Sequence, residues 1–230
     1  MISVCIATYN GERYLREQVD SILVQLGTAD ELIVSDDGST DSTLSILESY
    51  GDSRIRIFAN TNRKGVIGNF ENALKQAKGE YIFLSDQDDV WLPGKVEKCV
   101  EALQQADLAL HDATIIDADG NLIAPSFFAL RNTRKGFWAN LKKNGFIGCC
   151  MAFRREMLEK TLPFPPQIAI HDMWIGLLAS RKGKVNLVDE PLILYRRHEE
   201  NASSTGEKSG LSLKEKTAYR LRMWNEIRKR

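Results

Sequence analysis

A short apolar run leads directly into acidic residues in the stretch Glu80-Tyr81-Ile82-Phe83-Leu84-Ser85-Asp86-Gln87-Asp88-Asp89. Runs of this length, bounded by polar residues, are typical of strands buried in a sheet. Comparable strand runs occur at 2–8, 31–35 and 54–58, and helical patterns are expected at about 12–26, 41–50, 67–78 and 94–105. This alternation predicts successive βα units and an α/β fold with a mostly parallel sheet.

Three of these strands are followed by polar or acidic residues: Thr8, Tyr9 and Asn10; Asp36 and Asp37; and Asp86, Gln87, Asp88 and Asp89. In an open parallel sheet, ligands bind outside the carboxyl ends of the strands. We therefore expect these side chains to converge, and carboxylates so close together would repel each other without a cation. The oxygens of Asp86 and Asp88 suit Mg²⁺ or Mn²⁺, which would stabilise a departing diphosphate.

Each acidic group also has a purely structural interpretation. Asp88 and Asp89 could cap a helix that begins near Pro93, and Asp36 with Asp37 could form an Asx turn before the helix at 41. The chain has neither a Gly-x-x-x-x-Gly-Lys-Ser/Thr loop nor a Gly-x-Gly-x-x-Gly turn, which disfavours ATPase and dinucleotide-binding functions.

The composition excludes several classes of protein. The chain has 230 residues, of which 43% are hydrophobic, so it can bury a sizeable core. Lys plus Arg and Asp plus Glu both number 31, which gives no support to general nucleic-acid binding. No apolar run approaches the roughly 18 residues of a membrane span, and residues 2–8 are too short and polar for a signal peptide, so a cytoplasmic protein with reduced cysteines is expected.

The second half of the chain is less regular. We expect a strand at 107–116, a hairpin turn at 117–121, irregular chain at 122–146, and strands near 147–153, 184–189 and 191–197, with a helix at about 172–182. The predicted division is 1–105, 106–203 and a basic helix at 211–230. That helix has seven Lys or Arg against two Glu between Lys214 and Arg230; it either packs on the domain or contacts anionic lipid at the inner face of the membrane.

The sequence resembles the family 2 glycosyltransferases, which have the GT-A fold, a Rossmann-like sheet flanked by helices with a smaller acceptor-side lobe. The resemblance rests on three motifs in the right order and spacing, at residues 4–11, 31–41 and 78–89. It covers residues 1–105 strongly and extends more loosely to about 201.

The resemblance implies roles for the three strand ends. Thr8 and Tyr9 would line the base pocket, Asp37 would hydrogen-bond the pyrimidine, Asp86 would approach the ribose, and Asp88 would bind the metal. Asn10, Asp36 and Gln87 belong to the same donor-binding loops. Relatives carry an Arg-Asn pair where this chain has Phe70 and Glu71, so Arg63 or Lys64 would supply the phosphate contact instead.

In the second half, residues 169–174 resemble the segment that supplies the catalytic base, which makes Asp172 the candidate base; it could instead be a helix N-cap. His171 would orient Asp172 or the acceptor. Residues 194–198 resemble a segment in which a basic residue or His reaches the diphosphate or metal, which makes His198 the candidate among the three histidines; it could equally be a solvent-exposed loop histidine.

Gly148 and Cys149 are expected in the backbone wall of the acceptor cleft, or else in a sheet edge or bulge. Trp174, like Trp91, would stack on a sugar ring or serve the core. His111 is expected to be structural.

The resulting prediction is a metal-dependent inverting hexosyltransferase that uses Mn²⁺ or Mg²⁺. It would move a sugar from a nucleotide diphosphate, dTDP-rhamnose or a UDP-sugar, to a saccharide or lipid-linked saccharide in bacterial cell-surface polysaccharide assembly, because the motifs look closest to rhamnosyltransferases. Two alternatives remain open: a receiver-like signalling domain with Asp36 and Asp37 as its metal pair, and a non-catalytic sugar-binding module.

Overall fold

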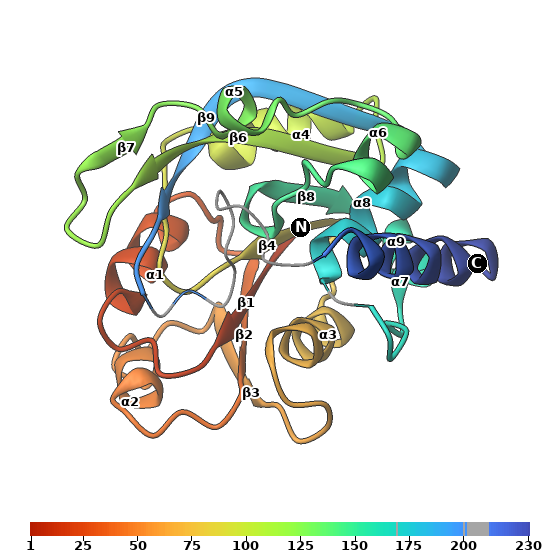
Figure 1. Ribbon diagram of the computed structural model, residues 1–230. Coiled ribbons are helices and arrows are strands. Elements are labelled where there is room, and N and C mark those ends of the chain that lie inside the picture. The colour runs from red at the N-terminus through yellow and green to blue at the C-terminus, as the bar shows by residue number, and fades with distance from the viewer. Residues whose placement is uncertain (169, 200, 202–211) are drawn as a thin grey trace.

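The first half of the chain forms the predicted βα units. The computed structural model describes residues 1–168, 170–199, 201 and 212–230. Its first elements alternate strictly between strand and helix: β1 (Ile2–Thr8), α1 (Leu15–Leu23), β2 (Glu31–Asp36), α2 (Thr43–Glu48), β3 (Ile55–Ala59), α3 (Val66–Gln76) and β4 (Tyr81–Ser85). The four strands pair in parallel in the order β3-β2-β1-β4, in the lower part of Figure 1. The predicted α/β fold class is confirmed.

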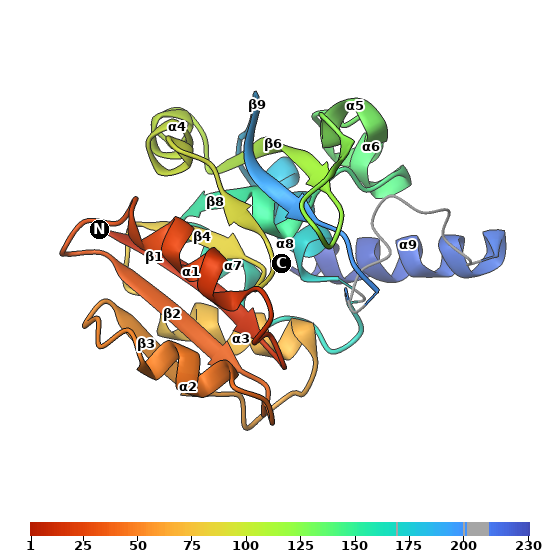
Figure 2. The same ribbon diagram turned by 90° about the vertical axis from the view of Figure 1, so that its left-hand side faces the viewer.

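The sheet continues without a break into the second half of the chain. β8 (Met151–Arg154) pairs antiparallel with β4 and also with β6 (Leu108–Ile116). Beyond β6 lie β9 (Val185–Arg196), which runs parallel to it, and the two-residue β5 (Val90–Trp91). A short strand, β7 (Leu122–Ala124), pairs with β6 across the predicted hairpin turn. One mixed sheet therefore spans both halves (Figures 1 and 2).

Two features of the second half differ from the prediction. Residues 184–189 and 191–197, expected as two strands, form the single strand β9, whose register shifts opposite His111 and Asp112. Pro191 lies beside that shift, where its missing N–H does not interrupt a regular ladder. The segment 122–146, expected to be irregular, contains β7, α5 (Phe127–Arg131) and α6 (Phe137–Lys142). Ser126 Oγ caps α5 by accepting the N–H of Ala129 at 3.0 Å.

The remaining helices cover the sheet. They are α4 (Lys95–Leu103), α7 (Glu156–Thr161), α8 (His171–Lys182) and α9 (Leu213–Arg228), with a single 3₁₀ turn, η1 (Gly148–Cys150), before β8. Helix α8 is buried on nearly every side, which explains why its apolar residues show no single-faced pattern. The described residues include no helix that is long and apolar enough to cross a membrane.

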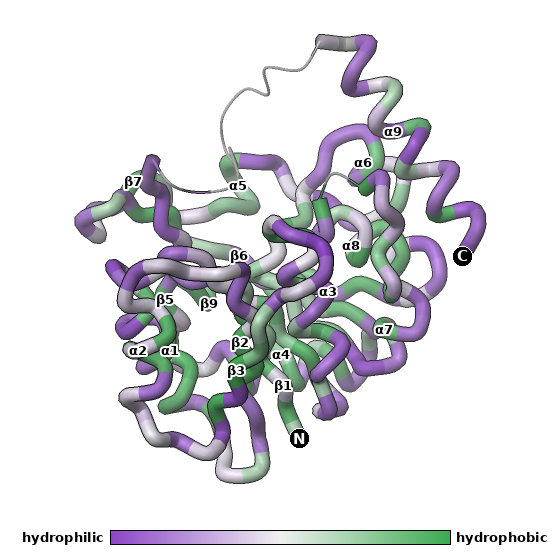
Figure 3. Tube along the Cα trace, turned by 90° about the horizontal axis from the view of Figure 1, so that it is seen from below, coloured by the Kyte–Doolittle hydropathy of each residue, from purple (hydrophilic) through white to green (hydrophobic). Residues whose placement is uncertain are grey.

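The core lies between the sheet and these helices. Residues of β1, β2 and β4 such as Ile6, Ile33 and Phe83 are fully buried, as is typical of parallel strands covered on both faces. Figure 3 shows the central strands largely in green and the surrounding loops with long purple segments. All four cysteines are buried and unpaired, as expected for reduced thiols. This packing leaves the carboxyl ends of β1, β2 and β4 at one edge of the sheet.

Candidate active site

The ends of β1 and β2 are tied together by Asp36. Its Oδ2 accepts the hydroxyl of Thr8 at 2.9 Å, and its Oδ1 accepts the N–H groups of Gly38 and Ser39 at 2.9 and 2.8 Å. Both oxygens are thus engaged within the loop, and the Asx-turn interpretation is correct for this residue. Asp36 shapes the loop that carries Asp37.

Asp37 lies at the mouth of the same loop. Its Oδ1 accepts the amide of Asn60 at 2.8 Å, and its Oδ2 accepts the N–H of Gly65 at 2.7 Å. Lys64 donates to the backbone oxygen of Asp37 at 2.8 Å and places its ammonium 3.6 Å from Oδ1. Lys64 is therefore the basic residue at this edge, whereas Arg63 turns away to donate to Pro165 and Pro166.

A reciprocal amide pair joins the ends of β1 and β4. The N–H of Tyr9 donates to Oε1 of Gln87 at 2.9 Å, and Nε2 of Gln87 donates to the carbonyl of Tyr9 at 3.0 Å. A Cβ at Gly11 would lie 2.6 Å from Oε1 of Gln87, so this close approach requires glycine. The Tyr9 ring stays exposed, and Asn10 adopts a positive φ of 47° so that its Oδ1 can accept the N–H of Thr40.

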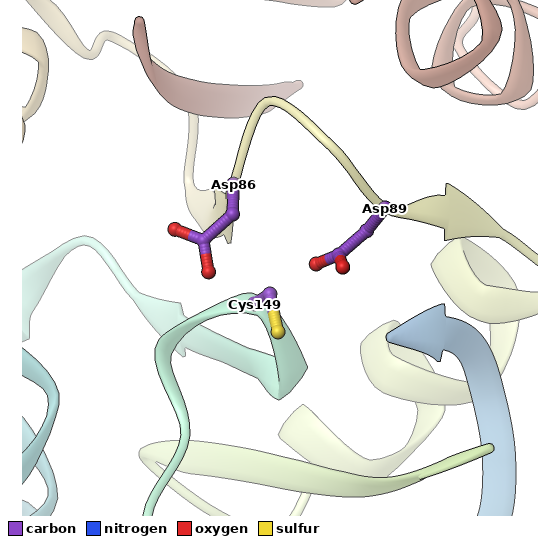
Figure 4. Close-up of side chains that lie close together, drawn as sticks. All are labelled: Asp86, Asp89 and Cys149. Carbon is purple, nitrogen blue, oxygen red and sulfur yellow. The ribbon is translucent and has the colours of Figure 1, made fainter. Parts of the chain in front are cut away.

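Three side chains converge just below this edge. One ligand atom from each of Asp86, Asp89 and Cys149 lies within 4.8 Å of the others, and Figure 4 shows the three side chains gathered together. Oδ2 of Asp89 is buried and has no hydrogen-bond partner among the described residues. Burial and the neighbouring charge of Asp88 raise the pKa of Asp86 to about 7, and burial with the charges of Asp88 and Asp86 raises the pKa of Asp89.

The converging carboxylates fit a divalent cation. Their mutual repulsion and the unpartnered oxygen of Asp89 are what a bound cation would relieve, and carboxylate oxygens are the ligands that Mg²⁺ and Mn²⁺ prefer. The sulfur of Cys149 is a softer donor and is the least suited of the three to these ions. Lys95 lies beneath the cluster, donating to the carbonyl of Cys149 at 2.7 Å, and burial lowers its pKa.

Asp88 belongs to a separate group of side chains. Its Oδ2 lies 2.8 Å from Nε2 of His198 and accepts the amide of Asn201 at 2.9 Å. His198 is largely buried, so the exposed-loop interpretation of this residue is wrong. The structure thus brings together the two residues that were predicted to bind the metal. Helix α4 begins at Lys95 without a side-chain cap, so Asp88 and Asp89 are not its capping residues.

Arg196 holds the acidic loop in place. It is 4% exposed; its N–H donates to Oδ1 of Asp89 and its Nε donates to the carbonyl of Asp88, each at 2.9 Å. Its guanidinium also pairs with Glu17 at 2.7 Å. A buried arginine with this many partners fixes the position of both acidic residues.

Asp172 lies in the first turn of α8, on the other side of the acidic cluster. Burial raises its pKa to about 7; the N–H groups of Met173 and Gly148 oppose that shift, and the charge of Asp86 adds to it. A Cβ at Gly148 would lie 3.7 Å from Cβ of Asp172, so Asp172 lies beside the turn that carries Cys149. The N-cap of α8 is Ile170, so the N-cap interpretation of Asp172 is wrong.

His171 is placed by packing rather than by hydrogen bonds. Its ring stacks on Phe70 with centroids 4.2 Å apart, and neither ring nitrogen has a partner among the described residues. Burial lowers its pKa to about 3, so the ring is neutral at pH 7. A Cβ at Gly148 would lie 3.0 Å from Nε2 of His171. Gly148 therefore permits a close backbone approach beside Asp172, from a 3₁₀ turn rather than a sheet edge.

Two of the residues expected on the acceptor side lie elsewhere. Trp174 is fully buried and donates its Nε1–H to Thr161 at 2.9 Å, so it serves the core and cannot stack on a sugar. Trp91 is buried as well. Cys149 has no exposed surface, and its sulfur lies within 4.8 Å of a carboxylate oxygen of Asp86 and of Asp89, so it does not line an acceptor cleft. His111 is buried, as expected of a structural residue.

The sequence interpretation expected Asp89 at this edge of the sheet but gave it no ligand role; it gave no site role to Lys95 or Asn201 and did not single out Arg196. Asp89 was interpretable as a helix cap, and Lys95 has the ordinary appearance of a solvent-facing helix residue. The position of Asn201 next to Asp88, across 113 residues of chain, has no local signal. Only its place as the third Asp within four residues, after Asp86 and Asp88, could have marked Asp89.

A comparison with known families decides between the alternatives. The model described as Glycosyl transferase family 2 matches residues 3–162. The chain belongs to this family. Membership rules against the receiver-like signalling domain, and the site described above coincides with the family 2 motifs predicted from the sequence.

Two relatives with named activities align with most of the chain. The UDP-Glc:alpha-D-GlcNAc-diphosphoundecaprenol beta-1,3-glucosyltransferase WfgD of Escherichia coli is 28% identical over 209 residues, covering 89% of this chain and 80% of WfgD. The dTDP-rhamnosyl transferase RfbG of Shigella flexneri is 29% identical over 215 residues, covering 85% of this chain and 72% of RfbG.

Solved structures share the fold. S. aureus TarS 1–349 in complex with UDP-GlcNAc superposes with a TM-score of 0.71 at 21% identity; the alignment covers 98% of this chain but 65% of the TarS chain, so this chain spans less than two thirds of it. Glucosyl-3-phosphoglycerate synthase from Mycobacterium tuberculosis, in complex with Mn²⁺, UDP and phosphoglyceric acid, gives a TM-score of 0.63 at 19% identity, covering 99% of this chain and 78% of that chain. These glycosyltransferases have the GT-A fold, and at such identities the likeness establishes the fold alone.

Proposed function

We propose that this chain is a metal-dependent, inverting hexosyltransferase of family 2, which moves a sugar from a nucleotide diphosphate to a saccharide hydroxyl. The observation that carries the proposal is the convergence of Asp86, Asp88 and Asp89 at one sheet edge, with Asp172 beside the turn that carries Cys149. A non-catalytic sugar-binding module has no need for a cluster of repelling carboxylates beside a buried acid.

In this proposal, residues 1–105 bind the donor. Tyr9 supplies an exposed ring at the nucleotide base, with Thr8 and Asn10 holding its loop. Asp37 accepts from the base, and Gln87 fixes the loop of Tyr9. Asp36 keeps Asp37 in position, and Asp86 faces the ribose. Lys64, whose ammonium is exposed beside Asp37, contacts the diphosphate in place of the family's arginine.

The cation is held by Asp88 with His198, next to the Asp86 and Asp89 pair. When bound, Mn²⁺ or Mg²⁺ supplies positive charge that stabilises the leaving diphosphate. His198 must be neutral at Nε2 to act as a ligand, and Arg196 keeps the acidic loop from moving as charge develops. The carboxylates of this cluster are hard donors and the imidazole of His198 is a borderline donor, and these ions accept both kinds.

Residues 106–203 bind the acceptor and supply the base. Asp172 takes the proton from the acceptor hydroxyl as the new bond forms at the sugar carbon, and a single displacement of this kind inverts the configuration there. Gly148 lets the backbone of this turn approach Asp172 and His171 closely, and His171 offers an unpartnered ring nitrogen to an acceptor hydroxyl. Trp174 positions α8 from the core.

The donor is a UDP-sugar or dTDP-rhamnose, and the acceptor is a saccharide, free or linked to a lipid carrier. The activities of WfgD and RfbG support these two donors, and that of WfgD supports a lipid-linked acceptor. Assembly of a bacterial cell-surface polysaccharide is the process in which such donors and acceptors meet.

Donor binding is tested by thermal shift with UDP-glucose, dTDP-rhamnose and GDP-mannose, each with and without Mn²⁺. A bound donor at about 100 times its dissociation constant adds about 2.7 kcal/mol, which raises Tm by several degrees. We expect a uracil or thymine nucleotide to give this shift only with Mn²⁺. Absence of a shift with every nucleotide sugar and metal would refute the proposal.

A further inference from the structure

The middle of the chain contains an unusually long stretch without acidic residues. From Asn121 to Arg155 there is no Asp or Glu, while Arg131, Arg134, Lys135, Lys142 and Lys143 all fall within α5, α6 and the adjoining loops. Helix α9, more than seventy residues later, is also strongly basic, with seven Lys or Arg against two Glu between Lys214 and Arg230. Because the net charge of the whole chain is zero, this excess of positive charge is local.

The fold brings these two basic segments together. The Trp138 and Trp224 rings lie 5.1 Å apart at their centroids, and the Phe137 and Trp224 rings lie 5.4 Å apart. Arg220 of α9 donates to the carbonyl of Lys142 in α6 at 2.5 Å. Figures 1 and 2 show α6 close to α9, and the two helices are in contact. The charges of both segments therefore act on one surface.

Large apolar side chains are exposed within this positive surface. Trp138 is 66% exposed and Leu221 is 57% exposed, and Leu221 lies one helical turn before Trp224. The guanidinium groups of Arg181 and Arg228 lie 5.0 and 5.9 Å from the Trp224 ring centroid. We call this the aromatic-basic surface; it consists of Trp138, Leu221, Trp224, Arg131, Arg134, Lys135, Lys142, Lys143, Arg181 and Arg228.

This combination matches the chemistry of an anionic membrane surface. Exposed tryptophan and leucine insert at the boundary between headgroups and acyl chains, and surrounding Lys and Arg are attracted to anionic headgroups. A folded protein partner would need acidic residues complementary to this surface, whereas an anionic bilayer matches both its charge and its exposed apolar side chains. No described helix could cross the membrane, so binding would be peripheral.

The aromatic-basic surface is linked directly to the helix that carries Asp172. The hydroxyl of Tyr219 in α9 lies 3.0 Å from Sδ of Met173, the residue after Asp172. The charge of Asp172 contributes to a raised pKa of Tyr219, after burial, which places the two side chains close together. A membrane seated on α6 and α9 would therefore lie near the first turn of α8.

We propose that the aromatic-basic surface binds anionic lipid and thereby holds the first turn of α8 toward an acceptor that is anchored in the membrane. The orientation toward a membrane-anchored acceptor rests on the proposed function, whereas the binding of anionic lipid does not. The sequence pointed only to the terminal helix; the structure adds α5 and α6, and the exposed Trp138, to the contact.

The test is co-sedimentation of the full chain with two kinds of vesicle, one of phosphatidylcholine alone and one of phosphatidylcholine and phosphatidylglycerol in equal parts. We expect binding only to the anionic vesicles, weakening as salt rises. Trp138→Ala should weaken it about 10-fold because an inserted aromatic side chain is lost. Replacing Arg134 and Lys135 together with Gln should weaken it about 30-fold, since each basic residue near the surface contributes about fivefold.

The matched control is Leu122→Ser with Ile123→Ser. These side chains are 64% and 56% exposed, but they lie in β7 outside the aromatic-basic surface, so their replacement should leave vesicle binding unchanged. Tryptophan fluorescence provides a second measurement: Trp91 and Trp174 are buried, so a blue shift on binding reports on Trp138 and Trp224. Unchanged Tm would establish that each variant folds.

Equal binding to both kinds of vesicle, no binding by the unaltered protein, or wild-type binding by the Trp138 and Arg134/Lys135 variants would each overturn the inference. If the anionic vesicles bind as expected but no nucleotide sugar shifts Tm, the proposed function fails and the lipid contact stands. If donors shift Tm and vesicles do not bind, the lipid contact alone is refuted.

Discussion

Nε2 of His198 lies 2.8 Å from Oδ2 of Asp88, and this contact joins two segments that are 110 residues apart in the chain. It brings the end of β9 to the loop after β4, where Arg196 also holds the backbone of Asp88. The imidazole of His198 and the carboxylate of Asp88 lie next to further carboxylates. This arrangement suits a cation that accepts both nitrogen and oxygen ligands. The first prediction follows from this pair.

We predict that His198→Ala raises the Mn²⁺ concentration needed for half-maximal transfer about 10- to 100-fold, the usual cost of losing a residue at or beside a metal site. Asp88→Asn should abolish metal-dependent transfer. Glu101→Gln, which alters an exposed carboxylate of α4, is the control and should titrate like the unaltered protein. The measurement is transfer rate against Mn²⁺ concentration; identical titrations for all variants would remove Asp88 and His198 from the metal site.

The second prediction concerns the pH dependence of transfer. Burial raises the pKa of Asp172 to about 7, and a general base works only when ionised, so kcat should rise with pH through that value. Asp172→Asn should keep the donor-induced Tm shift and lose about 10²- to 10⁴-fold in kcat. The residual rate of the variant should lack the rise near pH 7. A rate independent of pH in the unaltered protein would assign the base to another residue.

The same carboxylate predicts how stability changes with pH. The pKa of Asp172 is about 7 in the folded chain, against an ordinary value near 3.8, so the folded state binds the extra proton between these values. The free energy of unfolding therefore falls as pH rises, by about 1.4 kcal/mol per pH unit from this residue. Asp172→Asn removes this pH-dependent loss of stability, so the Tm of the variant should rise relative to that of the unaltered protein as pH increases. A Tm difference that does not change with pH would show that Asp172 titrates normally.

The fourth prediction tests the packing that carries α8. A Cβ at Gly176 would lie 2.4 Å from Cγ of Phe146, so Gly176→Ala should lower stability by about 1–3 kcal/mol despite the higher helix propensity of alanine. Phe146→Leu in the same chain should recover part of the loss, because the two positions are in contact. Denaturant unfolding of both single variants and the double variant gives the coupling; simple additivity would mean that the ring moves aside freely.

The sequence predicted the first half of the fold well because its signals are local. Each strand from Ile2–Thr8 to Tyr81–Ser85 is a short apolar run ended by polar residues, and each helix follows within a few positions. Elsewhere the elements are short: β5 is two residues long, and α5 and α6 are five and six residues, too short to show a periodic pattern. The joining of two predicted strands into β9 depends on pairing with β6, which no local pattern contains.

The residues of the candidate site also fall into two groups, those with a local signal in the sequence and those without one. Asp37, Asp86 and Asp88 were predictable because they follow strands whose ends must share one edge of the sheet. The fully buried side chains of Lys95 and Arg196 were not, because burial of a charge is decided by partners such as Cys149 and Glu17 that lie far away in the chain. The expectations for Trp174 and Cys149 were wrong for a related reason: the depth of a side chain is set by its neighbours in three dimensions.

The antiparallel strand β8 stands between β4 and β6, hydrogen-bonded to both. The acidic loop follows β4 and the turn beside Asp172 precedes β8. Because β4 and β8 are hydrogen-bonded to each other, the proposed donor side and acceptor side of the site are attached to the same part of the sheet. Domain closure of the kind that pivots on a linker is not available to this architecture. Substrates must instead enter and leave through displacement of surface loops, and turnover would be paced by the motion of those loops.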